Sequence, residues 1–139
     1  MIDFEILSRS PVFAGKSAQE LSSLLQGIPF QVRRYEKDAH VASAGDECSN
    51  LIIVLSGIVK GEMTDYHGKT IKIEDIEAPR PLAVAFLFGK NNRFPVTVVT
   101  TGDVELLYIP RAGFLKLLQK DQRILVNYLN SICSRTQFL

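Results

Sequence analysis

Side chains that could do covalent or metal chemistry are few in this sequence and lie far apart. The two cysteines, Cys48 and Cys133, have no second thiol or histidine at the short spacing that a zinc or iron–sulfur site uses. The two histidines, His40 and His67, form no H-x-H pair. No serine stands in a G-x-S-x-G context. We therefore expect no catalytic residue, no metal site, no cofactor and no enzymatic activity.

The chemistry that the sequence can support is ligand binding, around the stretch PLAVAFLFGKNNRFPVTVVT at residues 81–100. Seven consecutive apolar residues, 82–88, stand directly before a polar turn whose Lys90 and Arg93 could contact an anion. A polar turn of this kind is more often a solvated loop. The residues alone leave three interpretations of the apolar run open. It packs in the core, it lines a pocket for an apolar or weakly polar effector, or it belongs to a domain without a ligand.

The elements that position this stretch change from helix to strand and back to helix. Residues 17–26, SAQELSSLLQ, begin with a serine and place Glu20 three positions later, which is the spacing of a capping box. Between residues 30 and 109 turn residues separate short β-rich runs, which are FQVRRY, HVASAG, NLIIVLSGIVKGEMT, KTIKIEDI, FPVTVVTT and VELLYIP. After Pro110 the apolar spacing is helical again. This order predicts an α+β, mainly β fold, a β-roll or jelly roll flanked by N- and C-terminal helices.

The composition indicates one domain without a membrane segment. The chain has 139 residues, 46% hydrophobic and 22% charged, and no apolar stretch approaches the roughly 20 residues of a membrane helix. The N-terminus, MIDFEILSRS, lacks the basic-then-apolar layout of a secretory signal. We therefore expect a cytoplasmic protein with no membrane partner. A net charge of +1 gives no basic field to attract nucleic acid.

The segment AGDECSNLIIVLSGIVKGEMTDYHGKTIKI, residues 44–73, resembles the cyclic-nucleotide-binding domain of the catabolite-activator and fumarate–nitrate-reduction regulator superfamily. The matching features are a turn, a strand, a tight bend and a hairpin, at Gly45-Asp46, Ile52 to Leu55, Ser56-Gly57 and Asp65-Tyr66-His67-Gly68. Glycine at the bends can adopt the positive φ that such turns require. SPVFAGKSAQEL near the start and VELLYIPRAGFLKLL near the end extend the resemblance to nearly the whole chain.

In that superfamily the segment between the hairpin and the last strands is a phosphate-binding cassette. A short helix with a Gly-Glu-x-Ala sequence presents backbone N–H groups to the cyclic phosphate, and its glutamate accepts from the ribose hydroxyl. An arginine on the following strand binds the phosphate. The resemblance places the Gly-Glu pair on Leu82-Ala83, the alanine on Ala85 and the arginine on Phe94.

Departures from the family pattern at these positions argue against cyclic AMP. Arg93 lies one residue from the arginine position, and in a strand one step turns a side chain to the opposite face. Pro95 has no backbone N–H to donate. We expect a degenerate cassette that forms a remodelled pocket, with the candidate lining residues Leu82, Ala83, Val84, Ala85, Arg93, Phe94, Pro95, Val96 and Thr97.

The C-terminal helix contains the beginning of a coiled-coil pattern, since apolar residues recur every seven positions at Leu125, Ile132 and Leu139. The candidate dimerisation residues are Leu125, Tyr128, Leu129 and Ile132. A helix packed on its own β-roll is the alternative. In the resembled superfamily this helix dimerises two sensor domains and leads into a helix-turn-helix domain. We expect DNA contact only through such a C-terminal domain, which is absent from this sequence.

These patterns predict a β-roll sensor domain over residues 1–120 and the start of a dimerisation helix over residues 121–139. We expect the effector-sensing half of a transcription regulator, a homodimer that responds to an unidentified small molecule by population shift. A ligand-free dimerisation or interaction module is the first alternative. A cupin-like enzyme on the same double-stranded β-helix fold is the second, and it would need a metal.

Overall fold

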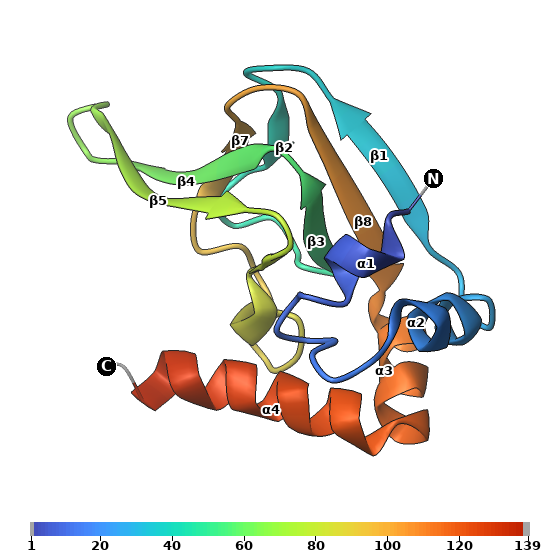
Figure 1. Cartoon of the computed structure of the whole chain (residues 1–139). Coiled ribbons are helices and arrows are strands. Elements are labelled where there is room, and N and C mark those ends of the chain that lie inside the picture. The colour runs from blue at the N-terminus through green and yellow to red at the C-terminus, as the bar shows by residue number, and fades with distance from the viewer. Residues whose placement is uncertain (1, 138–139) are drawn as a thin grey trace.

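Two antiparallel sheets of four strands each form the centre of the protein (Figure 1). The computed structural model describes residues 2–137, with side chains up to residue 134. One sheet has the strand order β1-β8-β3-β6, with the bounds β1 Gln31–Tyr35, β3 Asn50–Ser56, β6 Pro81–Leu82 and β8 Val104–Pro110. The other has the order β2-β7-β4-β5, with the bounds β2 His40–Ala42, β4 Ile58–Thr64, β5 Thr70–Glu77 and β7 Thr97–Thr100. The chain passes repeatedly from one sheet to the other, as in a jelly roll.

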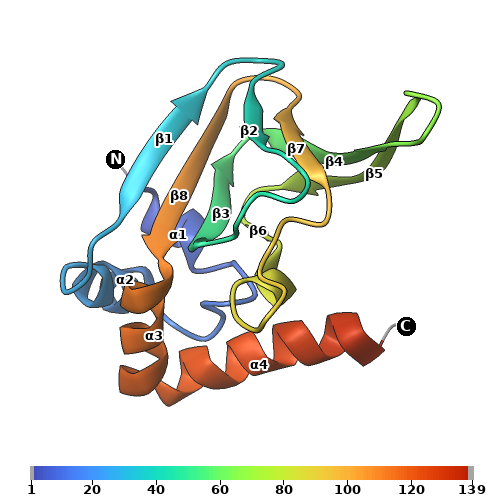
Figure 2. The same cartoon turned by 180° about the vertical axis from the view of Figure 1, so that it is seen from behind.

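Helices cover one end of this roll. Helices α1 (Phe4–Leu7) and α2 (Ala18–Leu25) precede the strands, and α3 (Arg111–Lys120) and α4 (Gln122–Gln137) follow them. Figures 1 and 2 show α4 running across the base of the roll, next to the short 3₁₀ helix η1 (Val84–Phe86). Helix α4 packs against both α3 and η1. The predicted fold class, a mainly β roll flanked by N- and C-terminal helices, is confirmed.

Local sequence signals explain where two of these elements begin. Helix α2 starts with the expected capping box, because the Ser17 hydroxyl accepts from the Glu20 amide at 3.1 Å and the Glu20 carboxylate accepts from the Ser17 amide at 2.9 Å. The bend between β3 and β4 requires glycine. Gly57 has a φ of +83°, and a Cβ there would lie 2.3 Å from the carbonyl oxygen of Asp103.

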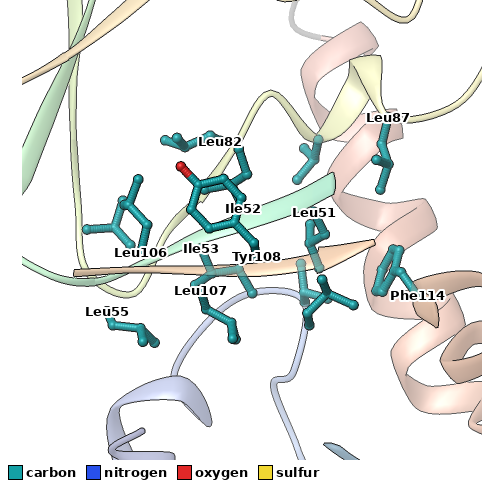
Figure 3. Close-up of a cluster of buried hydrophobic side chains, with 14 of the residues drawn as sticks. Leu51, Ile52, Ile53, Leu55, Leu82, Leu87, Leu106, Leu107, Tyr108 and Phe114 are labelled. Atoms are coloured by element: carbon teal, nitrogen blue, oxygen red, sulfur yellow. The ribbon is translucent and has the colours of Figure 1, made fainter. Parts of the chain in front are cut away.

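The core lies on both faces of the central strands β3 and β8. The other sheet covers one face of these strands and the helices cover the other. Side chains on both faces of each strand are therefore buried, as Figure 3 shows. This double burial explains why β3 reads as an uninterrupted apolar run, LIIVL, rather than an alternating one. The irregular segment around η1 packs against this core.

The hairpin of β4 and β5 extends away from the body of the roll (Figure 1). Its register shifts between Gly61 and Glu62, so that Gly61 lies opposite Glu74 while Glu62 lies opposite Lys72. Ile73 is therefore an extra residue in β5, which is a β-bulge. Because of the bulge, the residues of β5 before it and those after it do not share a single alternation between the two faces of the sheet.

Candidate functional site

An apolar cavity of about 510 Å³ lies between the β4–β5 hairpin, η1 and the segment that leads into β7. This volume is within the range of small-molecule pockets. Apolar side chains make up all of its lining but one residue, and they are Ile73, Ile76, Leu82, Ala83, Ala85, Phe86, Phe94, Pro95, Val96 and Val98. The exception is Glu74. No arginine or lysine is among the lining residues.

A glycine on β4, Gly61, lies among residues that line the cavity. Gly61 pairs with Glu74 on one side and with Val98 on the other, and both of these neighbours line the cavity. A Cβ at Gly61 would lie 3.0 Å from Cγ2 of Val96, which is another lining residue. A side chain at Gly61 would therefore press on Val96 and displace part of the lining.

Most of the candidate lining residues meet at this cavity, namely Leu82, Ala83, Ala85, Phe94, Pro95 and Val96. The others point elsewhere. Nη1 of Arg93 donates to the carbonyl oxygen of Gly45 at 2.9 Å, so this guanidinium supports the turn before β3. The Thr97 hydroxyl accepts from the Ala44 amide at 3.1 Å. Val84 is buried on the opposite side of η1.

The apolar run 82–88 has two faces, one toward the cavity and one toward the core. Ala83, Ala85 and Phe86 line the cavity, whereas Val84 and Leu87 are buried in the core. The run begins as the short strand β6 and becomes η1 after Ala83, whose φ of +49° is left-handed. A single 3₁₀ turn thus forms the wall between the cavity and the core.

The core side of this wall is hydrogen-bonded to α4. The Tyr128 hydroxyl donates to the carbonyl oxygen of Val84 at 2.9 Å. The Tyr128 ring stacks edge-on against Phe114, at 5.0 Å between centroids, and against Phe88, at 6.0 Å. Burial raises the pKa of the Tyr128 phenol to about 12, so the hydroxyl keeps its proton and remains a donor.

A second hydrogen-bonded contact fixes the wall to the start of α3. Nε of Arg111 donates to the carbonyl oxygen of Leu87 and Nη2 donates to that of Cys48, both at 2.6 Å. One guanidinium therefore joins the end of the 82–88 run to the residues before β3. Bonds from a charged donor are stronger than neutral ones, which makes this contact a rigid support.

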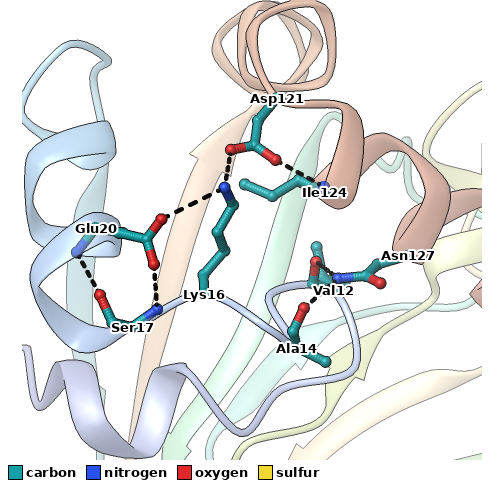
Figure 4. A network of polar contacts seen from close by, with 8 residues as sticks. All are labelled: Val12, Ala14, Lys16, Ser17, Glu20, Asp121, Ile124 and Asn127. Atoms are coloured by element: carbon teal, nitrogen blue, oxygen red, sulfur yellow. Dashed lines mark hydrogen bonds and ion pairs between the residues drawn. The ribbon is translucent and has the colours of Figure 1, made fainter.

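The first half of α4 is anchored to the N-terminal loop, as Figure 4 shows. Lys16 forms an ion pair with Asp121, and the Asn127 side chain donates to the carbonyl oxygens of Val12 at 3.1 Å and Ala14 at 2.8 Å. Burial opposes ionisation of Asp121, but hydrogen bonds from Lys16 and from the Ile124 amide outweigh it and lower the pKa of Asp121. The hydrogen bond to Asp121 raises the pKa of Lys16.

The candidate dimerisation residues occupy different environments. Tyr128 is buried in the protein's own core, and Leu125 and Ile132 are partly buried against it. Leu129 is 48% exposed, and its neighbour Val126 is 43% exposed. The seventh-residue position Leu139 lies outside the described residues. An apolar surface on α4 therefore centres on Val126 and Leu129.

The sequence alone does not reveal the contribution of β5 and of Phe86 to the cavity. The residues that it missed are Ile73, Glu74, Ile76, Phe86 and Val98. The run KTIKIEDI gave a signal for a strand, but the bulge at Ile73 prevents its alternation from showing which residues face inward. Val98 alternates with Val96 on the segment entering β7, and that spacing could have identified it.

The described residues give no sign of metal or membrane chemistry. No group of three histidine, cysteine, aspartate or glutamate side chains among them is arranged to hold a metal ion. Cys48 is buried and Cys133 is exposed on α4. None of the described helices combines the length and the apolar character needed to cross a membrane.

The chain is similar to a known protein family and to several solved structures. The family model described as cyclic nucleotide-binding domain matches residues 32–121. Among solved structures, a transcriptional regulator from Thermotoga maritima is 31% identical, with a TM-score of 0.78, over 85% of this chain and 90% of that one. No curated protein sequence matches the chain.

Two further structures share the fold at lower identity. The catabolite activator protein from Thermus thermophilus is 23% identical, with a TM-score of 0.78, over 91% of this chain and 58% of that one. The sensor domain of the transcriptional regulator DNR from Pseudomonas aeruginosa is 20% identical, with a TM-score of 0.78, over 94% of this chain and 86% of that one. The match to the Thermus protein thus spans little more than half of that protein's length.

Proposed function

Because the chain belongs to the cyclic nucleotide-binding domain family and resembles the sensor domains of catabolite-activator-type transcription regulators, we propose that it is an effector-sensing domain with a remodelled cavity. The effector is an apolar or weakly polar small molecule rather than a cyclic nucleotide. The observation that carries this proposal is the lining of the 510 Å³ cavity, which is apolar apart from Glu74.

A cyclic phosphate is a poor fit to this lining. Ala83 and Phe94 stand at the positions that the family resemblance assigns to the glutamate and the arginine, and both line the cavity. Arg93 is next to Phe94 in the sequence, but its guanidinium donates to the carbonyl oxygen of Gly45 instead. An anion moved out of water needs charged or N–H partners, and without them its desolvation is costly. An apolar ligand gains free energy from the same surface.

The contacts around η1 support a mechanism of population shift. A ligand in the cavity contacts Ala83 and Ala85. Two backbone carbonyls of the same 82–88 segment accept hydrogen bonds from the helices: that of Val84 from Tyr128, and that of Leu87 from Arg111. A ligand that binds one position of this wall better than another therefore favours one arrangement of α4. The anchored first half of α4 limits the change to the part of the helix beyond Asn127.

The proposal includes a homodimer and a DNA-reading domain outside these residues. The exposed apolar pair Val126 and Leu129 supports pairing of α4 with its copy, in line with the expected heptad pattern. In this arrangement the β-roll over residues 1–120 senses the effector, and the helix over residues 121–139 transmits its state. The expected cytoplasmic location and the lack of enzymatic activity are parts of the same proposal.

The same exposed pair favours the second candidate, a ligand-free dimerisation or interaction module. The two candidates differ in whether the cavity is used. The module needs only the surface of α4, whereas the sensor needs a ligand between β5 and η1.

Calorimetry with a compact neutral probe, 2-(1-naphthyl)ethanol, tests the proposal. The unmodified protein should bind this probe at one site. Replacing Ala85 with Phe should abolish binding because the larger side chain fills the cavity. The matched control is Ala112→Phe, since Ala112 is exposed on α3. Absence of binding by the unmodified protein, or equal binding by both variants, would favour the ligand-free module.

A further inference from the structure

The β4–β5 hairpin has a charged face where it extends from the roll (Figure 1). Nζ of Lys60 lies 3.5 Å from Oε2 of Glu62 on β4. Nζ of Lys72 lies 3.0 Å from Oδ2 of Asp75 on β5, although residues three apart in a regular strand point to opposite faces. The bulge at Ile73 accounts for this pairing. Because Glu62 lies opposite Lys72 in the register, both ion pairs occupy one face of the hairpin.

The other face of the hairpin is apolar and begins at the cavity. Met63 and Ile71 lie directly opposite each other in the register, and Ile73 is two residues beyond Ile71 on the same strand. These three residues are 50%, 47% and 51% exposed. Ile73 also lines the cavity. One apolar surface therefore runs from the lining of the cavity to the outer part of the hairpin.

We infer that the cavity binds linear alkyl amphiphiles. One end of the alkyl chain lies in the cavity, the chain leaves it beside Ile73 and lies against Met63 and Ile71, and the polar head remains in water. The inference rests on the proposed function and names the chemical class of its effector. It assigns Met63 and Ile71 as the residues that determine specificity for chain length.

A protein partner fits this face less well than an alkyl chain does. A stable protein interface buries at least about 1,000 Å². The apolar face of the hairpin offers three half-exposed side chains, and a charged face lies directly behind them. An alkyl chain is narrow enough for such a strip, and it gains free energy for each methylene group that is removed from water.

Three neutral ligands that differ only in chain length test the inference. They are 1,2-hexanediol, 1,2-octanediol and 1,2-decanediol, each titrated into the whole chain by calorimetry at concentrations where the diol does not self-associate. The affinity should rise about tenfold at each step, because each step adds two methylene groups that can be buried. The compact ligand 2-(1-naphthyl)ethanol, titrated in parallel, reports on the cavity alone.

The Ile71→Thr variant assigns the outer part of the chain to the hairpin. It should bind 1,2-decanediol about fivefold more weakly, since part of the chain loses its apolar contact, and bind 2-(1-naphthyl)ethanol as the unmodified protein does. Threonine retains a high strand propensity. Met63→Thr should have the same effect from the opposite strand. The matched control is Ile58→Thr, because Ile58 is 39% exposed on β4, does not line the cavity and alternates with Lys60 on the charged face.

The outcomes separate this inference from the proposed function. An affinity that does not rise beyond 1,2-hexanediol, or that rises equally in Ile71→Thr, overturns the alkyl chain and, with 2-(1-naphthyl)ethanol bound, leaves the apolar cavity in use. If Ile71→Thr changes the sedimentation of the protein but not its affinity for 1,2-decanediol, the face binds a second copy and the inference is wrong. Failure of the diols and of 2-(1-naphthyl)ethanol to bind overturns both.

Discussion

The hydroxyl of Tyr128 on α4 donates a hydrogen bond of 2.9 Å to the carbonyl oxygen of Val84 in η1. Val84 stands between Ala83 and Ala85, which line the cavity. This bond therefore joins the wall of the candidate ligand site directly to the C-terminal helix. It gives the population-shift mechanism a defined physical contact, since the wall cannot move far without changing the position or strength of that bond.

Removing this hydroxyl should uncouple the helix from the cavity. The Tyr128→Phe variant leaves a carbonyl in a buried environment without its donor, which typically costs about 1–3 kcal/mol of unfolding free energy. Urea denaturation measures the loss. Tyr66→Phe, at a tyrosine that is 88% exposed, should leave the stability unchanged.

The coupling itself can be followed at Cys133. This thiol is exposed on α4, whereas Cys48 is buried, so a fluorophore can be attached to Cys133 selectively. Binding of 2-(1-naphthyl)ethanol should change the fluorescence in the unmodified protein and have a smaller effect in Tyr128→Phe. An equal response in the two proteins would show that the signal does not pass through Tyr128.

The ion pair of Lys16 and Asp121 should make stability depend on pH in a defined direction. The pKa of Asp121 is lowered from 3.8, so its contribution is present above about pH 3.8 and is lost as the pH falls through the lower, folded-state value. The pKa of Lys16 is raised from 10.5, so its contribution is present below that pH and is lost as the pH rises through the higher, folded-state value.

The Asp121→Asn variant isolates this effect. At pH 7 it should unfold more easily than the unmodified protein, by about 1.5–3 kcal/mol, the usual contribution of a hydrogen bond to a charged group. This difference should shrink as the pH falls below 3.8. Urea denaturation between pH 3 and pH 7 measures it, and a difference that stays constant over that range would contradict the assignment.

Exposed apolar residues on α4 should control assembly. Replacing Val126 and Leu129 with Glu places two charges on the expected seam, and the protein should become monomeric while its β circular-dichroism signal is retained. Sedimentation velocity measures the change. Tyr128 and Ile132 are left intact, because both contact the protein's own core. A monomeric unmodified protein at high concentration would show that α4 does not pair.

The fold could be predicted from the sequence because its signals are local. The capping box at Ser17, the bend at Gly57 and the continuous apolar strand 51–55 each correspond to a structural requirement that the residues themselves satisfy. The positive φ of Gly45, Gly57 and Gly68 is likewise as expected.

The cavity could be predicted only in part because it depends on contacts between distant segments. The run 82–88 revealed its apolar content but not its two faces, which follow from the left-handed turn at Ala83. The place of Glu74 depends on the bulge at Ile73, and a register shift of this kind leaves no clear mark in the sequence. The hydrogen bond of Tyr128 joins residues 44 positions apart, so helical spacing alone suggested a dimer seam at that position.

Calorimetric titration of the unmodified protein with cyclic AMP measures whether the cavity has lost its affinity for a cyclic nucleotide, as the proposed function requires. Losing the arginine and the ribose acceptor removes about 3–6 kcal/mol, or some two to four orders of magnitude in affinity. The expected result is a dissociation constant above the millimolar range, with 2-(1-naphthyl)ethanol binding in the same buffer. Micromolar binding of cyclic AMP would instead show that the cassette still binds a cyclic phosphate, and it would identify Arg93 as the phosphate-binding arginine after release from the Gly45 carbonyl.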